Sequence, residues 1–485
     1  MPSIYDKYEV VVGLETHAQL STNSKIFAPD ATAFGASPNT QVSFITLGHP
    51  GVLPVLNEKV VDFAIKMGLA TNCKIQKHQY FDRKNYFYAD LPKGFQTTQD
   101  AKPICYDGFL DVTVGDKTTK IRINRIHLEE DAGKSTHDQD PYFSLIDLNR
   151  AGVPLIEIVT EPDFRTSDEA YEYLAQIRQL VQYLGVCDGN MEEGSLRCDA
   201  NVSVRLKGET RLGQRAEVKN MNSLKNVKLA IEYEAKRQIR LLEKGEKVKL
   251  ETRSFDADTN TTFSLREKEM ANDYRYFPEP DLQPIVLTDE YINEIRAEIP
   301  ALPKQLVEKY TKKLGLSAYD AKVLTDEKAF SDYFNETIKY TKHYKAAANW
   351  LTVPVKSFLN KSHVNIADFA ISPKTLAELV ELVQSGKVNF SLAAQELFPV
   401  LVENPTEKPA KLAEKLKLIT ESDDALIEQL IDDVMAKFPD KVKAYRKGKK
   451  GLAGFFMGQI MRMSKTKLDP KLTNKMLNIK LSAKH

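Results

Sequence analysis

The chain has 485 residues, 42% hydrophobic and 28% charged, a composition that excludes an extensively disordered protein. No apolar run reaches the roughly 20 residues that span a bilayer, and the N-terminus lacks the basic and apolar regions of a signal peptide. The four cysteines show no close pairing motif, as is typical of a reduced cytoplasmic protein. We therefore expect a cytoplasmic protein of roughly three domains, at about 150 residues per domain.

The net charge of +1 conceals an uneven distribution. Residues 441–485 carry thirteen Lys and Arg but one acid, so this tail is about +12 and the remainder of the chain about −11. A basic C-terminal segment in an otherwise acidic chain suggests an anionic partner that one domain binds and another domain processes. We expect the tail to bind nucleic acid, and a merely solvated surface is the alternative.

The first predicted strand covers residues 10–20, where polar and apolar residues alternate. Glu15 and His17 fall on the same face of this strand, side by side. An acid and an imidazole two residues apart can both bind one metal ion. The alternative is an exposed polar face without a ligand.

A helix is expected over residues 58–72, followed by the cationic and aromatic segment 82–88. This mixture suits phosphate contact or base stacking, and it is equally consistent with a strand whose aromatic side chains face the core. Lys93 follows in a loop next to Gly94.

The densest polar stretch is residues 125–137, which includes three consecutive acids, two histidines and a Gly-Lys-Ser. It follows a predicted strand over 120–130. The Gly-Lys-Ser does not form a phosphate loop, because Leu128 stands where that motif requires glycine. Since carboxylates suit hard cations such as magnesium, the stretch indicates a metal-mediated phosphate site. A solvated acidic turn is the alternative.

The next strands are expected at 145–148 and 155–159, and the clearest alternation covers 196–206. Helices are expected at 168–184, with Ser167 as N-cap, and at 223–244. The polar face of the strand at 196–206 carries Arg197, Asp199 and Asn201, a set that suits metal and phosphate. The polar side chains of the following strand are Arg215, Glu217 and Lys219.

After Pro303 the pattern becomes helical, for example over 319–338 and 373–385. Residues 404–409 are a candidate linker, and the basic tail is helical again. The cysteines have no nucleophile signature around them, and no serine lies in an amidase-like segment, so we expect no glutaminase activity from this chain alone.

Several blocks together resemble the B subunits of the tRNA-dependent amidotransferases, the GatB family. The similarity covers nearly the whole chain, and the blocks that carry it are Val12–His17, Pro50–Pro54, Asp82–Tyr86, His127–Ser135, Asp147–Arg150, Met191–Asn201 and Asp273–Asp281.

The resemblance implies an α+β fold: a mixed-sheet α/β cradle domain over 1–295, an all-helical domain over 296–405 and a basic helical tail over 406–485 that binds tRNA. It implies an ATP- and Mg²⁺-dependent ligase that amidates misacylated Glu-tRNA(Gln) or Asp-tRNA(Asn) by phosphorylating the side-chain carboxylate. It also implies a heterotrimer without a membrane partner. In that heterotrimer an amidase-fold glutaminase, the A subunit, supplies ammonia, and a small C subunit joins the other two.

By the same resemblance, Glu15, His17 and Glu130 lie near the metal and the ammonia entry, and Lys84 and Lys93 lie along the ammonia passage. We expect the first three to converge on one divalent ion. The further metal ligands that we expect are Glu193, Asp199 and Glu217, and the phosphate contacts that we expect are Arg83 and Arg197.

Two other classes of protein remain open. A metal-dependent phosphohydrolase without an RNA substrate would not need the basic tail. A non-catalytic RNA-binding scaffold would not turn over ATP, and its acidic clusters would be expendable.

Overall fold

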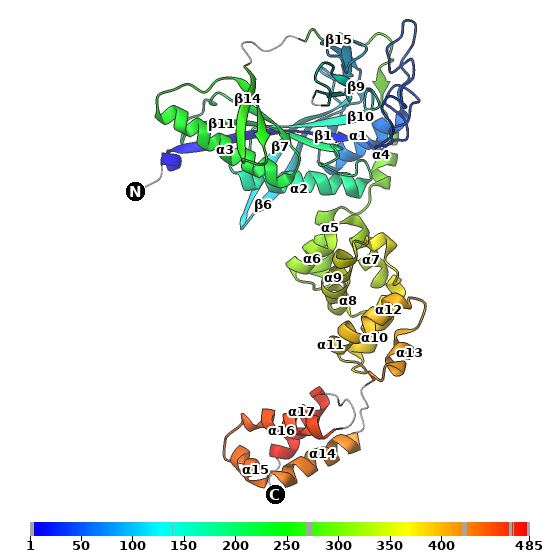
Figure 1. The fold of residues 1–485 in the computed structure, drawn as a ribbon, viewed down its shortest axis with the longest axis vertical. Helices are drawn as coiled ribbons and strands as arrows, with labels where there is room; N and C mark the ends of the chain where they lie inside the picture. The colour runs from blue at the N-terminus through cyan, green and yellow to red at the C-terminus, as the bar shows by residue number, and fades with distance from the viewer. Residues whose placement is uncertain are drawn as a thin grey trace. The chain divides into compact units, whose positions relative to one another are not determined.

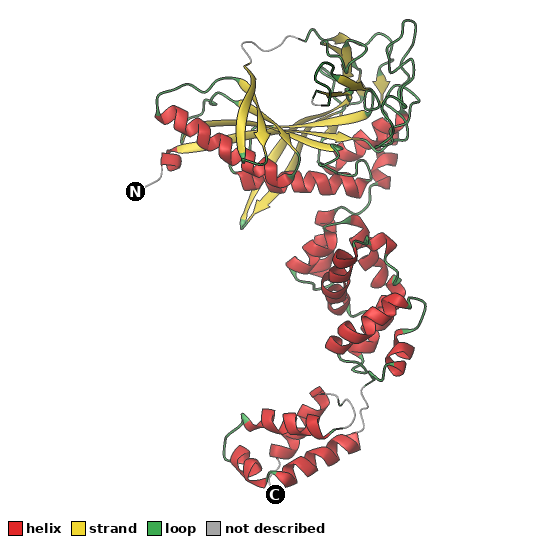
Figure 2. Ribbon diagram, viewed as in Figure 1, coloured by secondary structure: helices red, strands yellow, loops and turns green. Residues whose placement is uncertain are grey.

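The computed structural model describes residues 4–137, 139–267, 274–419, 424–464, 468 and 470–482. The chain divides into two compact units, Met1–Pro303 and Lys304–His485. The strands of the described chain lie in the first unit, and the second is helical, as the expected α+β fold requires (Figure 2). The expected boundary after residue 295 lies within helix α4 (Asp289–Glu298), and the first unit ends at Pro303, where the sequence pattern becomes helical.

The first unit contains a 12-stranded mixed sheet with the order β14-β13-β12-β11-β1-β10-β7-β5-β4-β15, and off this path β6 pairs with β7 and β2 pairs with β6. Its pairs are antiparallel except for β12 and β13. Two small two-stranded sheets pair β16 with β3 and β8 with β9. The strands are β1 (Tyr8–Gln19), β2 (Lys74–Ile75), β3 (His78–Gln79), β4 (Asp82–Asn85), β5 (Phe95–Thr98), β6 (Cys105–Val114), β7 (Lys117–Glu130), β8 (Lys134–Thr136), β9 (Leu145–Asp147), β10 (Pro154–Thr160), β11 (Leu196–Leu206), β12 (Ala216–Met221), β13 (Glu251–Asp256), β14 (Thr261–Glu267), β15 (Phe277–Pro278) and β16 (Ile285–Val286).

Three helices cover one face of this sheet: α1 (Glu58–Ala70), α2 (Ser167–Leu184) and α3 (Leu224–Glu243) (Figure 1). The central strands bury alternate residues against them, for example Leu14 of β1 and Val202 of β11. Most of the intervening side chains of β1 and β11 are polar and face the opposite side, since successive residues of a strand point to opposite faces. The alternation predicted over 196–206 is confirmed, and it leaves one face of the sheet polar and uncovered.

The ends of the helices follow local capping chemistry. Ser223 caps α3 as an extended residue whose side chain accepts a hydrogen bond from Asn226 N. The cap of α2 is Thr166 and not the predicted Ser167, because Thr166 and Glu169 form a reciprocal capping box. The box satisfies two backbone N–H groups at the start of α2, which Ser167 cannot do from inside the helix.

The second unit consists of helices α5 (Pro303–Glu308), α6 (Ala318–Thr325), α7 (Lys328–Thr337), α8 (Tyr344–Trp350), α9 (Lys356–Ser362), α10 (Pro373–Gln384), α11 (Phe390–Leu392), α12 (Phe398–Glu403), α13 (Pro409–Lys415), α14 (Asp424–Lys437), α15 (Pro439–Arg446), α16 (Leu452–Met463) and α17 (Pro470–Ser482). The single helix predicted over 319–338 is two helices, because Glu327 adopts an extended backbone between α6 and α7. Helices α14 to α17 pack around an apolar core of their own, which includes Ile431 and Phe456. Among the helices of the described residues, none has the length and low polarity that a membrane crossing requires.

Candidate functional site

The uncovered face of the sheet is hollowed into a cavity of about 770 Å³, which we call the sheet pocket. Its lining includes polar side chains of β1, β7, β10, β11 and β12. Lys84, Tyr86, Tyr274 and Tyr276 also line it. The pocket therefore gathers residues that are far apart in the sequence, and the pairing of the strands fixes their relative positions.

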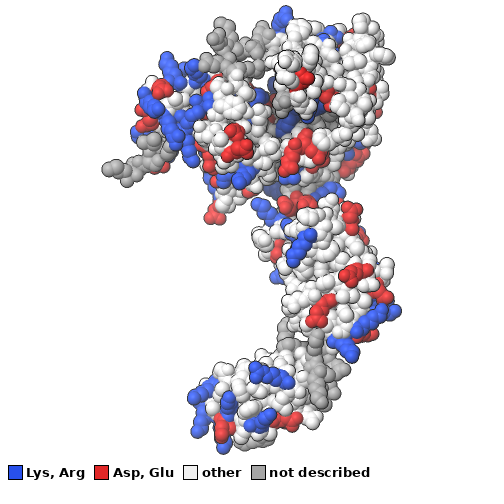
Figure 3. Space-filling view, in the orientation of Figure 1, with Lys and Arg blue, Asp and Glu red and all other residues white. Residues whose placement is uncertain are grey.

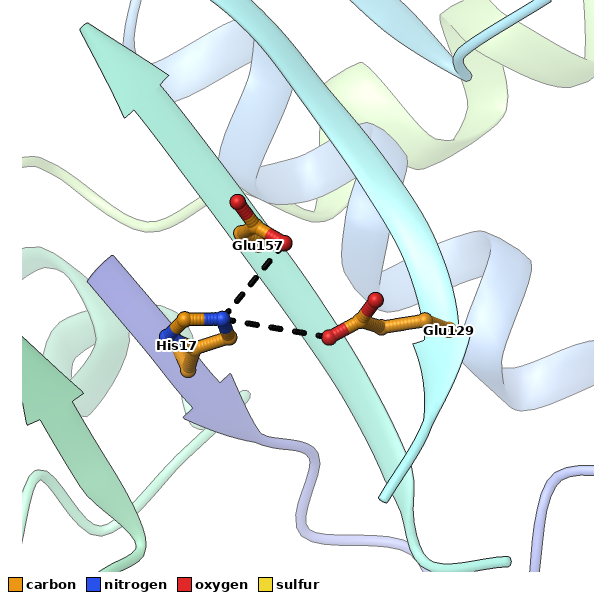
Figure 4. Close-up of side chains that lie close together, drawn as sticks. All are labelled: His17, Glu129 and Glu157. Atoms are coloured by element: carbon orange, nitrogen blue, oxygen red, sulfur yellow. Dashed lines mark ion pairs between the residues drawn. The ribbon is translucent and has the colours of Figure 1, made fainter. Parts of the chain in front are cut away.

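The first acidic cluster in the sheet pocket consists of His17, Glu129 and Glu157 (Figure 4). The antiparallel register places His17 of β1 opposite Glu157 of β10, and Glu157 opposite His127 of β7. His17 Nε2 lies 3.4 Å from Glu157 Oε2 and 3.9 Å from Glu129 Oε1. One ligand atom from each residue of the cluster lies within 4.8 Å of the others. We call this set the histidine cluster.

Glu157 lies between two imidazoles, since its Oε2 is 3.4 Å from His17 Nε2 and 3.2 Å from His127 Nε2. Burial disfavours both imidazolium ions, but Glu157 and Glu129 outweigh it and raise the pKa of His17 to about 8 and that of His127 to about 9. Burial also disfavours the Glu157 carboxylate, yet the two histidines hold its pKa well below the usual range. The two carboxylates thus balance two imidazolium ions, and a cation bound at the histidine cluster would take the place of the proton on His17.

The second acidic cluster, the carboxylate cluster, consists of Glu15, Asp199 and Glu217. Glu15 lies opposite Asp199 in the pairing of β1 with β11, and its Oε1 accepts a hydrogen bond of 2.7 Å from Asn201. Lys219 contacts Asp199 and lies 3.0 Å from Glu217 Oε1. Burial and the nearby carboxylates Glu157, Glu217 and Asp199 raise the pKa of Glu15. Three converging carboxylates against one lysine leave this cluster with excess negative charge.

Both clusters have the donor chemistry of divalent-cation sites. Carboxylate oxygens suit magnesium, whose ligands lie at about 2.0–2.1 Å from the ion, and an imidazole nitrogen is an additional donor in the histidine cluster. In each cluster the three ligand atoms lie within 4.8 Å of one another, so a single ion could be held by all three. The carboxylates of both clusters therefore fit the magnesium that the sequence resemblance implies, and the three oxygen donors of the carboxylate cluster fit it better than the mixed donors of the histidine cluster.

Glu130 does not join Glu15 and His17, so the expected convergence of these three on one ion does not fit this arrangement. Glu130 Oε1 lies 2.5 Å from Lys93 Nζ and accepts a hydrogen bond of 2.7 Å from Thr97 N. It lines a separate cavity of about 190 Å³, which we call the lysine cavity. The reason is the period of the strand: Glu130 shares a face of β7 with Leu128, whereas Glu129 shares the pocket face with His127.

Two other predicted residues are also placed differently. Glu193 is exposed in the turn before β11 and belongs to neither cluster. Arg83 is occupied by an ion pair, because its Nε and Nη2 each lie 2.7 Å from the Glu279 carboxylate and Nη2 lies 3.1 Å from Asp281. The geometry therefore gives no support to Glu193 as a metal ligand or to Arg83 as a phosphate contact.

Arg197 lines the sheet pocket, and its Nη2 lies 2.7 Å from Asp131 Oδ2. Lys84 lines the same pocket, with its Nζ 4.9 Å from the centre of the Tyr274 ring. Lys93 lines the lysine cavity, so the two predicted passage lysines lie in different cavities. In the segment 82–88, Tyr86 lines the sheet pocket and Phe87 is exposed, so these aromatic side chains do not form a core-facing strand.

Sequence reasoning missed Glu129, Glu157 and His127 as partners of His17. Two sequence signals could have identified Glu157 and Glu129. Glu157 is the one charged residue within the apolar strand from Pro154 to Thr160, and Glu129 alternates with His127 on the polar face of the strand next to it. An acid within an otherwise buried strand is costly unless it is paired.

The fold and the sheet pocket define an enzyme domain: an apolar face covered by helices, and a polar face where buried acids, histidines and lysines converge. Residues 10–293 match the family model described as GatB/GatE catalytic domain, and residues 332–481 match the model described as GatB domain. The chain is 50% identical over 472 residues to the B subunit of an aspartyl/glutamyl-tRNA(Asn/Gln) amidotransferase from Thermodesulfovibrio yellowstonii, a match that covers 97% of this chain and 98% of the relative. It is 48% identical to the proteins of the same name from Rickettsia typhi and Rickettsia conorii, with 98% of each chain covered. The chain therefore belongs to the GatB family, the B subunits of the tRNA-dependent amidotransferases.

Proposed function

We propose that this chain carries out the ATP-dependent amidation of glutamate on tRNA(Gln), or of aspartate on tRNA(Asn), in the sheet pocket. The single observation that carries this proposal is the presence of two acidic clusters on one face of one pocket. Similarity to relatives named for that tRNA-linked activity supports the substrate.

The reaction has two steps. A carboxylate resists attack by ammonia because its leaving group is poor. The side-chain carboxylate first attacks the γ-phosphorus of ATP, so that a carbon-bound oxygen becomes linked to phosphorus as ADP leaves. Ammonia then attacks the carbonyl carbon, inorganic phosphate leaves and the nitrogen loses a proton, which gives the amide.

The residues of the chain prepare both steps. The two clusters are the places where divalent cations would be held, and bound magnesium would neutralise the phosphate oxygens of ATP. The Asp131 carboxylate, whose pKa Arg197 and Arg150 lower against the opposing effect of burial, orients Arg197 at the pocket. Lys219 restrains Asp199 and Glu217 of the carboxylate cluster.

Ammonia would enter by way of the lysine cavity. Glu130 and Lys93 line this cavity and contact each other, and the neighbouring residue Asp131 lines both the lysine cavity and the sheet pocket. A carboxylate paired with a lysine can accept the proton of an incoming ammonium ion and release neutral ammonia, the nucleophile. A separate amidase-fold glutaminase would supply that ammonia, and a small third protein would complete a heterotrimer.

The basic tail would bind the tRNA. Lys443, Arg446, Lys447, Lys449 and Lys450 are exposed around the loop between α15 and α16, and basic side chains project from this part of the chain in Figure 3. Exposed basic side chains that outnumber the nearby acidic ones can bind the phosphates of a nucleic acid.

The test is ATP consumption by the assembled complex in the presence of misacylated or correctly acylated tRNA. We expect ADP to form with the misacylated substrate and not with the correctly acylated one, and amide formation to follow from glutamine or from ammonium salts. The chain alone is expected to release no glutamate from glutamine. ATP turnover that is independent of tRNA would instead support the phosphohydrolase alternative, and no ATP turnover at all would support the RNA-binding scaffold.

A further inference from the structure

The cations that line the sheet pocket are unevenly paired. Arg197 is paired with Asp131, and Lys219 with Asp199 and Glu217. Arg125 also lines the pocket, but its side chain makes no hydrogen bond or ion pair with any residue that the structure describes. This difference sets Arg125 apart from the arginine and lysine that hold the acids in place.

Arg125 lies on the polar face of β7, two and four residues before His127 and Glu129. Its Cα is opposite Val159 of β10 and Tyr106 of β6, and neither of these neighbours offers a carboxylate. The Nε atom of Arg125 is buried without a hydrogen-bond partner among the described residues. A guanidinium group has five hydrogen-bond donors, and leaving a buried donor unpaired is costly. We therefore expect a bound ligand to accept a hydrogen bond from Arg125.

The side chains around Arg125 favour the binding of an anionic ligand that also carries an aromatic ring. Tyr274 and Tyr276 line the same pocket as Arg125, and the positive charge of Arg125 opposes the rise in the pKa of Tyr276 that burial and Asp100 cause. Tyr274 and Tyr276 stack edge to face with ring centres 6.5 Å apart, and Lys84 Nζ lies near the Tyr274 ring. Lys84 likewise has no carboxylate partner among the described residues, so two unpaired cations and two aromatic rings share this end of the pocket.

We propose that Arg125 is a phosphate-binding residue of the sheet pocket, with the guanidinium contacting a phosphate of an adenosine-containing substrate. A phosphate accepts several hydrogen bonds from a guanidinium at once, and Arg is better suited to this than Lys because its donors are fixed in one plane. This inference rests on the proposed function, which brings phosphates from two substrates to the pocket: those of ATP and that of the 3′-terminal adenosine of tRNA.

The experiment compares the full-length wild-type chain with Arg125→Gln and Arg125→Lys, after thermal unfolding has shown that each variant is folded. Arg122→Gln is the matched control, since Arg122 lies on the same strand but is paired with Asp163 outside the pocket. Calorimetry measures binding of ATP, AMP, adenosine and tripolyphosphate, and kinetics on the assembled complex give kcat and KM for misacylated tRNA.

If Arg125 holds a phosphate of ATP, Arg125→Gln weakens ATP and tripolyphosphate binding by roughly ten- to a hundredfold, the value of a charge-assisted hydrogen bond. Adenosine binding stays unchanged, Arg125→Lys is intermediate and Arg122→Gln matches the wild type. If the phosphate belongs to the tRNA, ATP binding is unchanged and KM for tRNA rises by a similar factor at constant kcat.

Arg125→Gln that binds ATP and tripolyphosphate as the wild type does, and that leaves KM for tRNA unchanged, overturns the inference. Equal losses for adenosine and ATP also overturn it, because the loss would then come from distortion of the pocket. A wild-type complex that does not consume ATP contradicts the proposed function instead, and the tripolyphosphate and tRNA measurements still decide the role of Arg125.

Discussion

The contact between Glu130 and Lys93 gives a sharp test of the lysine cavity. The side chains are 5% and 18% exposed, so both charges are largely removed from water, and each compensates the other. Glu130→Gln preserves the shape and the acceptor for Thr97 N, but it leaves the Lys93 ammonium without a counter-charge. Lys93→Met makes the reciprocal change, and the double variant removes both charges.

Breaking a buried ion pair from one side costs about 3–5 kcal/mol. Because Lys93 is partly exposed and Gln keeps one hydrogen bond, we expect the lower end, about 3 kcal/mol, for Glu130→Gln. With an unfolding entropy of about 2.1 cal/mol/K per residue, a unit that spans Met1–Pro303 shifts by roughly 1.6 °C per kcal/mol, so the unfolding transition should fall by roughly 5 °C. The double variant should recover most of this loss, since no unpaired charge remains.

Urea or thermal unfolding of the four proteins measures the coupling free energy of the pair through a double-mutant cycle. Amide formation from ammonium salts, measured in the assembled complex, should be strongly reduced in all three variants while tRNA binding persists. Single-variant losses below about 1 kcal/mol that simply add in the double variant would refute the assignment of a buried, charge-compensating pair.

Three further predictions use other parts of the chain. Glu157→Gln should remove one of two divalent-cation sites, and Asp199→Asn should remove the other. Calorimetric titration with Mn²⁺ should therefore find two sites in the wild type and one in each variant. A variant that loses both sites would instead indicate a single site that the two clusters share. Burial alone would raise the pKa of Glu169, but hydrogen bonds from the Arg165 N–H and neighbouring groups lower it. The Glu169 carboxylate therefore stabilises the folded state above its unfolded pKa of about 4.3, and this stabilisation is lost as the pH falls through the lower pKa of the folded state. Because Gln can still complete the capping box, Glu169→Gln should lower the unfolding free energy at pH 7 by only about 0.3–1 kcal/mol, the contribution of a negative charge in the first turn of a helix. The variant should also lose less stability than the wild type as the pH falls, as urea titrations at several pH values would show, and an unchanged pH dependence in acid would contradict this. Truncation before Lys441 should weaken tRNA binding and reduce its log–log salt slope by about 0.7–0.9 per lost phosphate contact, and an unchanged slope would mean that the tail is only a solvated surface.

The sequence predicted the elements that build the sheet pocket better than it predicted which side chains meet there. Alternation placed Glu15 and His17 on one face of β1, and Asp199 on the polar face of β11. Those predictions depend on period-two geometry within a single strand, which is local. Asp199 and Glu217 do join Glu15, because β11 and β12 are also consecutive neighbours in the sheet.

The partners of His17 could not be predicted in the same way. Which strands lie next to β1 depends on pairing between segments more than one hundred residues apart, and the choice between Glu129 and Glu130 depends on which face of β7 turns to the pocket. Arg83 was misassigned for a related reason. Its partner Glu279 is nearly two hundred residues away, and only the tertiary structure shows that the guanidinium is already occupied.

The position of β1 in the sheet has a consequence for the order of events during synthesis. Among the strands of the sheet, β1 is made before its two neighbours, β10 and β11, which begin at Pro154 and Leu196. At about 5–20 residues per second, both edges of this strand stay unpaired for roughly 7–28 seconds until β10 has been added, and one edge stays open for roughly 9–37 seconds until β11 is complete. An open strand edge is a template for pairing with other chains. The nascent chain is therefore most exposed to aggregation before residue 206 has been added, and slowing translation in that interval should lower the yield of folded protein.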